Sequence, residues 1–135
     1  MTQIPPSSPS KTTYWIGHAV SAFPVLMLFV SAAMKLAKPE FIVKGFTEHN
    51  GYSESVIIPL GIIELVCTVL YLVPQTSFLG AILLTGYLGG ATATHVRIGE
   101  YPEAFMGAIP FGVLLWLGLY LREPRLRTLA PWKRN

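Results

Sequence analysis

The stretch from Pro59 to Pro74, "PLGIIELVCTVLYLVP", decides the fold of this chain. Aliphatic side chains fill most of it, and Glu64 is its only charged residue. An apolar helix of this length approaches the thickness of the hydrocarbon core of a bilayer, which is about 30 Å. A carboxyl group near the bilayer centre costs about 3 kcal/mol, whereas each Leu, Ile or Val returns about 0.3–0.6 kcal/mol. Because aliphatic residues dominate the run, the sequence predicts a membrane-spanning helix that carries a glutamate inside it.

Three other apolar runs have a similar length, so we predict four membrane spans. They lie at about residues 15–34, 56–73, 78–96 and 105–121. Only "PQTS" separates the second span from the third, which predicts a tight antiparallel hairpin. Each of the last three runs is about twice as long as a tilted transmembrane β-strand requires. The predicted fold is therefore all-α, a transmembrane four-helix bundle built from antiparallel hairpins.

The membrane domain should cover residues 14–122, with a tail on either side. Residues 1–13 are rich in Pro and Ser, which predicts a disordered tail, and residues 123–135 form a basic tail. Small residues at 31–33 resemble a signal-peptide cleavage site. The apolar run before them is long for a signal peptide, however, and three more spans follow, so we expect the first span to be retained.

The composition points to lipid rather than water as the solvent. Hydrophobic residues make up 52% of the 135-residue chain and charged residues only 13%, against about 25% charged residues in soluble domains. The net charge of +3 does not indicate a nucleic-acid partner, because half of the ten Lys and Arg residues lie after residue 121. Cys67 is the only cysteine, which excludes an internal disulfide, a CxxC redox pair and a multi-cysteine metal site.

Four spans place both termini on one side of the membrane. That side carries Lys11 and the basic tail, whereas the other carries Lys35, Lys38, Lys44 and Arg97. The positive-inside rule then predicts cytoplasmic termini, in the inner (plasma) membrane of a bacterium.

The first loop contains a short helical pattern between Pro39 and Gly51. Pro39 suits a helix start, Asn50-Gly51 suits a helix end, and Phe41, Ile42 and Phe46 share one face. We predict a short interfacial helix here, and an ordinary loop is the alternative.

Polar residues of the second span form one stripe. Glu64, Cys67, Thr68 and Tyr71 follow the i, i+3, i+4, i+7 spacing, so they share a helix face that we expect to point into the bundle. An intramembrane carboxyl group indicates a functional site. It can also be structural, holding neighbouring helices in register. Lys35 we expect to extend to the lipid headgroups.

The third span has the most distinctive sequence, "LLTGYLGGATATHVR". Thr85, Gly89, Thr92 and His95 fall on one stripe, and Gly86 and Gly90 have GxxxG spacing. We predict that Gly86, Gly89 and Gly90 let another helix approach closely. Tyr87 lies at the depth of Glu64, so we expect Glu64 to meet Tyr87 or Thr85 across the hairpin. His95 lies about 10 Å from Glu64 along the membrane normal, too far for a direct contact.

The sequence lacks the motifs that mark several common kinds of catalytic and metal-binding sites. There is no HExxH, P-loop, GxSxG or GxGxxG motif, and no histidine pair has the spacing of a single-helix metal site. His18 and His95 are predicted at opposite faces of the membrane, which disfavours haem between them. We therefore predict no metal and assign no catalytic residue.

Much of the chain resembles the DoxX-like family of small bacterial membrane proteins. The segments that carry the resemblance are "SAAMKLAKP", "IELVCTVLYLVP", "LGAILLTGYLGGATATHVRIGE" and "GVLLWLGLYLREPRLRTLAP". The resemblance implies a four-helix integral membrane protein. Members of the wider superfamily include a membrane subunit of a thiosulfate:quinone oxidoreductase and a maturation protein for a periplasmic amine dehydrogenase, so the resemblance also implies a link to redox chemistry.

Three functions remain open at this stage. The first is a membrane subunit whose polar pocket near Glu64 binds a quinone-like or lipid ligand, or a partner protein, with quinone as the possible cofactor. The second is an oligomeric transporter of protons or small solutes, and the third is a structural scaffold. A membrane redox partner or a homo-oligomer would serve as partner. The candidate ligand-binding residues are Lys35, Glu64, Tyr71, Thr85, Tyr87, Thr92, His95 and Arg97.

Overall fold

A computed structural model describes residues 8–129, and within this part of the chain all regular structure is helical. Four segments are long and apolar enough to cross a membrane, namely Lys11–Ala37, Glu54–Leu72, Ser77–Arg97 and Tyr101–Arg122. They confirm the four predicted spans. The elements are α1 (Lys11–Ala37), α2 (Glu40–Lys44), η1 (Gly45–His49), η2 (Glu54–Val56), α3 (Ile57–Leu72), α4 (Ser77–Arg97), α5 (Tyr101–Met106), α6 (Ala108–Arg122) and α7 (Pro124–Thr128).

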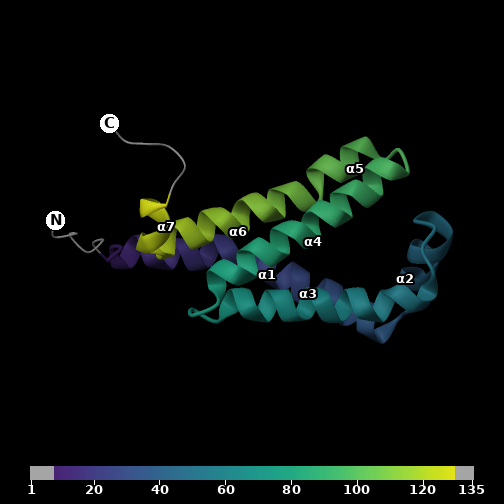
Figure 1. Ribbon diagram of the computed structural model, residues 1–135, viewed down its shortest axis with the longest axis horizontal. Helices are drawn as coiled ribbons and strands as arrows, with labels where there is room; N and C mark the ends of the chain where they lie inside the picture. The colour runs from purple at the N-terminus through teal and green to yellow at the C-terminus, as the bar shows by residue number, and fades with distance from the viewer. Residues whose placement is uncertain (1–7, 130–135) are drawn as a thin grey trace.

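The four long helices form a ring of pairwise contacts. Helix α1 packs against α3 and α6, and α4 packs against the same two helices (Figure 1). The chain reverses between α3 and α4 in a turn at residues 73–76, where Thr76 Oγ1 donates a 2.7 Å hydrogen bond to the carbonyl oxygen of Leu70. This side-chain bond satisfies one of the carbonyl groups that a helix end leaves free.

Glycines bring the helices close together at the end of the bundle that holds this turn, which we call the closed end. A Cβ atom on Gly80 would overlap the backbone of Tyr71, and one on Gly17 would lie 2.8 Å from the carbonyl oxygen of Gly118. Because glycine has no side chain, the backbones of α3 and α4 lie almost in contact at Gly80. The backbones of α1 and α6 do the same at Gly17.

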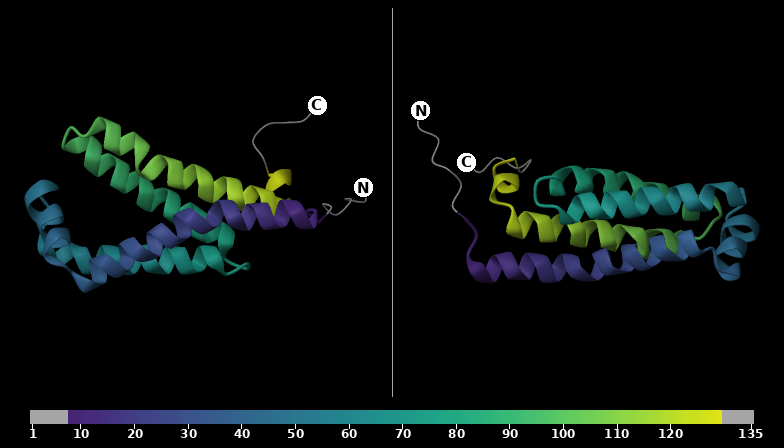
Figure 2. Two further views of the ribbon diagram at one scale, coloured as in Figure 1. Left: turned by 180° about the vertical axis from the view of Figure 1, so that it is seen from behind. Right: turned by 90° about the horizontal axis from the view of Figure 1, so that it is seen from below.

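Towards the opposite end, which we call the open end, the bundle separates into two arms. One arm is α1 with α3, which stay close where a Cβ on Gly61 would meet Lys35 at 2.9 Å. The other arm is α4 with α5 and α6. The arms diverge towards the end that carries α2 (Figures 1 and 2).

The second span turns its polar stripe inward, as predicted. Glu64, Cys67, Thr68 and Tyr71 are all buried. Aliphatic residues of the same helix, such as Ile62, Val66 and Val69, are exposed on the outside. This distribution suits a helix whose outer face meets lipid and whose inner face meets the other spans.

Two regions differ in detail from the sequence prediction. The fourth span is broken at Gly107 into α5 and α6, because Pro110 has no N–H to donate to the carbonyl of Met106 one turn earlier. The first loop does contain a helix, α2, which continues as the π-helical turn η1; its position at a membrane interface stays a prediction. Of the predicted tails at 1–13 and 123–135, residues 1–7 and 130–135 lie outside the described residues. Helix α1 already begins at Lys11, within the predicted disordered tail, and α7 shows that the basic C-terminal segment begins as a helix.

Candidate functional site

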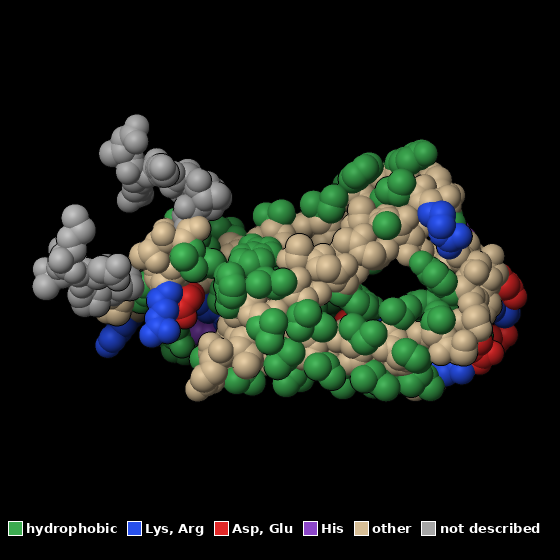
Figure 3. Space-filling view, in the orientation of Figure 1, with side chains coloured by type: hydrophobic (Ala, Val, Ile, Leu, Met, Phe, Trp, Pro, Cys, Tyr) green, Lys and Arg blue, Asp and Glu red, His purple; other side chains and the backbone are tan. Residues whose placement is uncertain are grey.

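The divergence of the two arms creates a cavity of about 620 Å³ between them. Its size lies within the range of about 300–1,000 Å³ that is typical of small-molecule sites. Apolar side chains form most of its walls, from α1, α3, α4 and α6. The principal ones are Met27, Leu28, Leu60, Ile63, Leu83, Leu88 and Phe111. Figure 3 shows the molecule hollowed between the arms, with hydrophobic side chains around the opening.

Glu64 lies on the wall of this cavity and is the centre of a polar cluster. Only 2% of its surface is exposed. Its Oε2 atom accepts hydrogen bonds from Lys35 Nζ at 2.8 Å, from Ser31 Oγ at 3.2 Å and from Tyr87 OH at 3.2 Å. The predicted contact with Tyr87 across the hairpin is therefore present, and α1 supplies two further partners.

Lys35 forms an ion pair with Glu64 and does not extend to the headgroups, so the expectation for this residue was wrong. Its ammonium group lies 2.8 Å from Glu64 Oε2 and 2.6 Å from Ser31 Oγ. The physical reason is the close packing of α1 on α3 at Gly61, which places the root of the lysine side chain beside the helix that carries Glu64. Two opposite charges buried together avoid the cost of burying either one alone.

The cluster keeps hydrogen-bonding capacity for a further group. Within the part of the chain that the structure describes, all three bonds to the Glu64 carboxylate go to Oε2, and none goes to Oε1. The Lys35 ammonium group has three N–H bonds, and its two recorded partners use two of them. An acceptor and a donor are thus left side by side in the same cavity.

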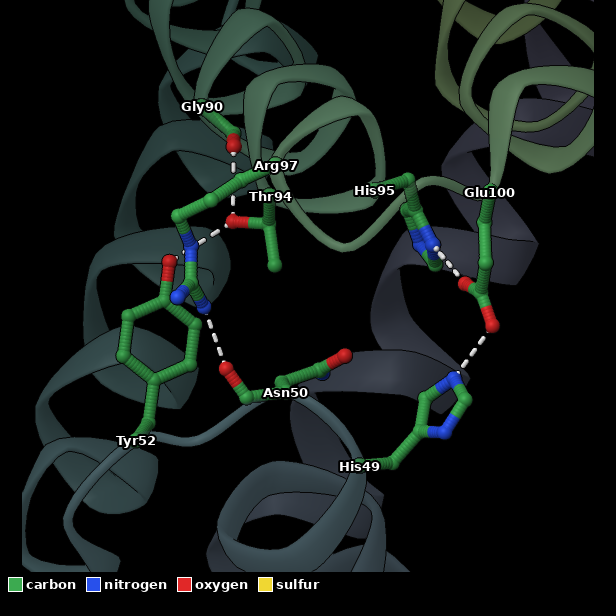
Figure 4. Close-up of polar contacts among 8 residues, drawn as sticks. All are labelled: His49, Asn50, Tyr52, Gly90, Thr94, His95, Arg97 and Glu100. Carbon is green, nitrogen blue, oxygen red and sulfur yellow. Dashed lines mark hydrogen bonds and ion pairs between the residues drawn. The ribbon is translucent and has the colours of Figure 1, made fainter.

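The mouth of the cavity at the open end is crossed by two polar ties between the first loop and the end of α4. In the first tie, the Glu100 carboxylate binds His95 Nδ1 at 2.7 Å and also binds His49 Nε2 (Figure 4). The hydrogen bond to His95, together with the contact with His49, lowers the pKa of the Glu100 carboxyl and outweighs the opposing effect of burial. Glu100 is therefore a stable anion that links two histidines from distant parts of the chain.

The second tie uses Arg97, whose guanidinium group donates to the carbonyl oxygen of Asn50 and lies 5.4 Å from the ring centre of Tyr52 (Figure 4). Tyr52 OH in turn shares a 2.7 Å hydrogen bond with Thr94 Oγ1. Asn50 is among the residues that line the cavity, and its side-chain oxygen is buried without a hydrogen-bond partner among the described residues. Arg97 therefore holds the loop in place and is not among the residues that line the cavity.

Of the predicted ligand-binding residues, Lys35, Glu64, Tyr87 and His95 line the cavity, and their binding of a ligand stays a prediction. Thr85 and Thr92 lie elsewhere. They line a separate groove between α4 and α6, where Thr85 Oγ1 accepts a 2.7 Å hydrogen bond from Trp116 Nε1. The reason is the helical rotation of about 100° per residue, which turns Thr85 away from the face of α4 that carries Tyr87.

Tyr71 belongs to the closed end rather than to the cavity. It is fully buried, and its hydroxyl group is 2.9 Å from Ser21 Oγ and donates to the carbonyl oxygen of Leu115 at 2.5 Å. These bonds join α1, α3 and α6. Tyr71 therefore holds the helices together two turns away from Glu64.

The predicted packing glycines of α4 contact no other helix among the described residues. A Cβ atom added to Gly86, Gly89 or Gly90 would meet nothing within 4 Å. The prediction of close packing at these positions was therefore wrong within a single chain, and packing against another copy stays a prediction. The close helix contacts are made by Gly17, Gly61, Gly80 and Gly118.

Sequence reasoning missed Ser31 and Glu100. Ser31 stands one helical turn before Lys35, and this i, i+4 spacing was a signal that both residues face the same neighbour. Glu100 follows a glycine in a loop, so no periodicity marked it. Within residues 8–129, no group of three or more His, Cys, Asp or Glu side chains, the tie of Glu100 with His49 and His95 included, has an arrangement that could hold a metal ion.

Comparison with known proteins agrees with this architecture. The model of the DoxX-like family matches residues 19–130, which include most of the first span and all of the other three. No curated protein and no solved structure matches the chain significantly. The family match confirms the resemblance found in the sequence. With four apolar helices arranged around an internal cavity, the chain belongs to the DoxX-like family and is a multi-pass membrane protein.

Proposed function

We propose that this protein binds a small apolar ligand with a hydrogen-bonding head, of the quinone type, in the cavity beside Glu64. The observation that carries the proposal is the buried Lys35–Glu64 pair, which faces a cavity of about 620 Å³ and keeps one acceptor and one donor free. Ligand sites in proteins are mostly apolar with a few placed polar groups, and this cavity has that character.

The free groups suit both redox forms of a quinone. A carbonyl oxygen of the oxidised ring accepts a hydrogen bond from the Lys35 ammonium group, and the hydroxyl group of the reduced ring donates to Glu64 Oε1. Tyr87 OH, which already donates to Oε2, limits the rotation of the carboxylate.

In this proposal the protein is a membrane subunit that presents the ligand to a redox partner in the bacterial inner membrane. A cytoplasmic location of both termini is supported by the count of basic residues in the sequence, because Lys11 and the five Lys and Arg residues after residue 121 lie on the side of the termini and only four lie on the other side. Cations next to a span favour the cytoplasmic side. The open end, with the cavity mouth and the histidine–glutamate tie, would then face the periplasm.

The proposal is tested by equilibrium binding of a decyl-substituted benzoquinone to the protein in lipid nanodiscs. The Glu64→Gln variant keeps the shape of the side chain but removes the counter-charge of Lys35. We expect it to bind at least about tenfold more weakly, since a hydrogen bond to a charged group contributes about 1.5–3 kcal/mol.

Thr92→Val is the control, because Thr92 lies on α4, the helix that carries Tyr87, but lines the separate groove. Its affinity for the quinone should equal that of the wild type. Equal binding by wild type and Glu64→Gln, or no binding by the wild type, contradicts the proposed function.

A further inference from the structure

Two glycines of α4 lie on the wall of the cavity and also on the outer surface of the bundle. Gly86 and Gly90 line the cavity, and both are exposed. A Cβ atom added to either would meet no atom within 4 Å. The wall of the cavity is therefore open at these positions because side chains are missing.

The facing helix α3 contributes to the same opening. Ile63 of α3 and Leu83 of α4 both line the cavity, and 48% and 41% of their surfaces are exposed. A side chain that belongs to both a cavity wall and the outer surface marks an edge of an opening. Figure 3 shows this opening between the arm that contains α3 and the arm that contains α4, with hydrophobic side chains along its rim.

The position of the opening along the bundle places it within the spans. Gly86 is the neighbour of Tyr87, which donates to Glu64, and Gly90 follows one helical turn later. The opening thus lies beside the polar cluster, where the surrounding medium is hydrocarbon. Its edges are apolar, unlike the mouth at the open end, which is crossed by the Glu100 and Arg97 ties.

We propose that the gap between α3 and α4 is a lateral portal, held open by Gly86 and Gly90, through which a ligand with a long apolar chain enters the cavity from the membrane. The inference rests on the proposed function and specifies its ligand. The head of the ligand lies at Lys35 and Glu64, and its chain remains in the portal and extends into the hydrocarbon layer. The apolar chain of the ligand covers the exposed faces of Ile63 and Leu83. Its head forms hydrogen bonds with Lys35 and Glu64, which the apolar tail of a lipid cannot form.

Cys67 offers a test that does not depend on quinone binding, because it is the only cysteine of the chain and it lines the cavity. The protein in lipid nanodiscs is exposed to a long-chain N-alkyl maleimide dissolved in the bilayer, and the rate of thiol labelling is followed by mass spectrometry. Gly86→Leu and Gly90→Leu place side chains in the portal, singly and together. Gly89→Leu is the matched control, since Gly89 lines the groove towards α6 and also has space for a side chain.

We expect the double variant Gly86→Leu/Gly90→Leu to label Cys67 about tenfold more slowly than the wild type, which corresponds to about 1.4 kcal/mol of added barrier. Gly89→Leu should label at the wild-type rate. Equal rates in all variants overturn the portal. So does a wild type that is not labelled in lipid but is labelled after unfolding in SDS, because another copy or a closed gap then covers the opening.

Failure of the portal is distinguishable from failure of the proposed function. If the decyl-substituted benzoquinone binds the wild type and Gly86→Leu/Gly90→Leu with equal affinity and equal association rate, the site exists but the portal does not. If the portal variants slow maleimide labelling while the wild type binds no quinone, the portal stands and the quinone-type head is wrong.

Discussion

Removing Lys35 should destabilise the protein far more than removing the whole ion pair. The two charged atoms lie 2.8 Å apart, and the side chains of Lys35 and Glu64 are only 12% and 2% exposed. At an effective dielectric constant of about 20, their gross attraction is about 6 kcal/mol. Most of this attraction is offset by the loss of hydration of both ions, so the net contribution of the pair is small.

Lys35→Met leaves the Glu64 carboxylate buried without its counter-charge, and we expect a loss of about 3–5 kcal/mol in the free energy of unfolding. The double variant Lys35→Met/Glu64→Leu replaces both ions by apolar side chains, and its free energy should return to within about 1 kcal/mol of the wild type. The assay is reversible unfolding in mixed micelles with a rising fraction of SDS, followed by far-ultraviolet circular dichroism.

Two results would refute this reasoning. A Lys35→Met variant with wild-type stability would mean that the pair is hydrated or absent. A double variant as unstable as Lys35→Met would mean that the loss does not come from the unpaired Glu64 carboxylate but from other bonds of Lys35, such as the one to Ser31. Quinone binding should be lost in both variants, which separates the role of the pair in binding from its role in stability.

Three further predictions concern the glycines and the tie at the mouth. Gly80→Ala should lower the free energy of unfolding by about 1–3 kcal/mol in the same assay, because its Cβ atom would overlap the backbone of Tyr71; a neutral effect would place α4 further from α3. Gly86→Ala should be neutral or stabilising by up to about 1 kcal/mol, since the site has space and alanine favours the helix; a loss above about 1 kcal/mol would reveal a packed neighbour. The hydrogen bonds to His95 and His49 lower the pKa of Glu100, so the unfolded chain takes up the proton first as the pH falls. The stabilising effect of this carboxylate should therefore be complete above the ordinary glutamate value of 4.5 and should fade below it. We expect the difference in unfolding midpoint between wild type and Glu100→Gln to shrink between neutral pH and about pH 3, and a constant difference would contradict the tie.

The helices were predictable from the sequence because their signals are local. The length of each apolar run fixes the spans, and a period of 3.6 residues places Glu64 and Tyr71 on the inner face of α3. The break at Gly107 has a local cause too, in Pro110, although the sequence prediction treated the fourth span as continuous.

The partners of Glu64 were only half predictable, because they depend on how the helices are rotated against one another. Depth along the span correctly favoured Tyr87. It favoured Thr85 equally, although Thr85 points towards Trp116 on α6. Lys35 was misjudged because the general tendency of a terminal lysine to reach the headgroups was applied without knowing that α1 and α3 touch at Gly61.

The glycines of α4 show why a motif does not specify a contact. GxxxG spacing removes side chains from one helix face, and that face is then free either to meet another helix or to border an empty space. A helix contact requires that the arm of α1 and α3 lie close to the glycine. It does so at Gly80, but the two arms have diverged before Gly86. The direction in which two helix pairs diverge is a property of the whole bundle and is not encoded in a local spacing.

The most direct test is an experimental structure of the protein in lipid, solved with a chain-bearing quinone. The proposed site predicts density for a ring in the cavity, within hydrogen-bond distance of Lys35 Nζ and Glu64 Oε1, and density for its chain between α3 and α4. A bundle whose arms are closed over an empty or absent cavity, or a Glu64 side chain that points outward at acyl chains, would contradict it.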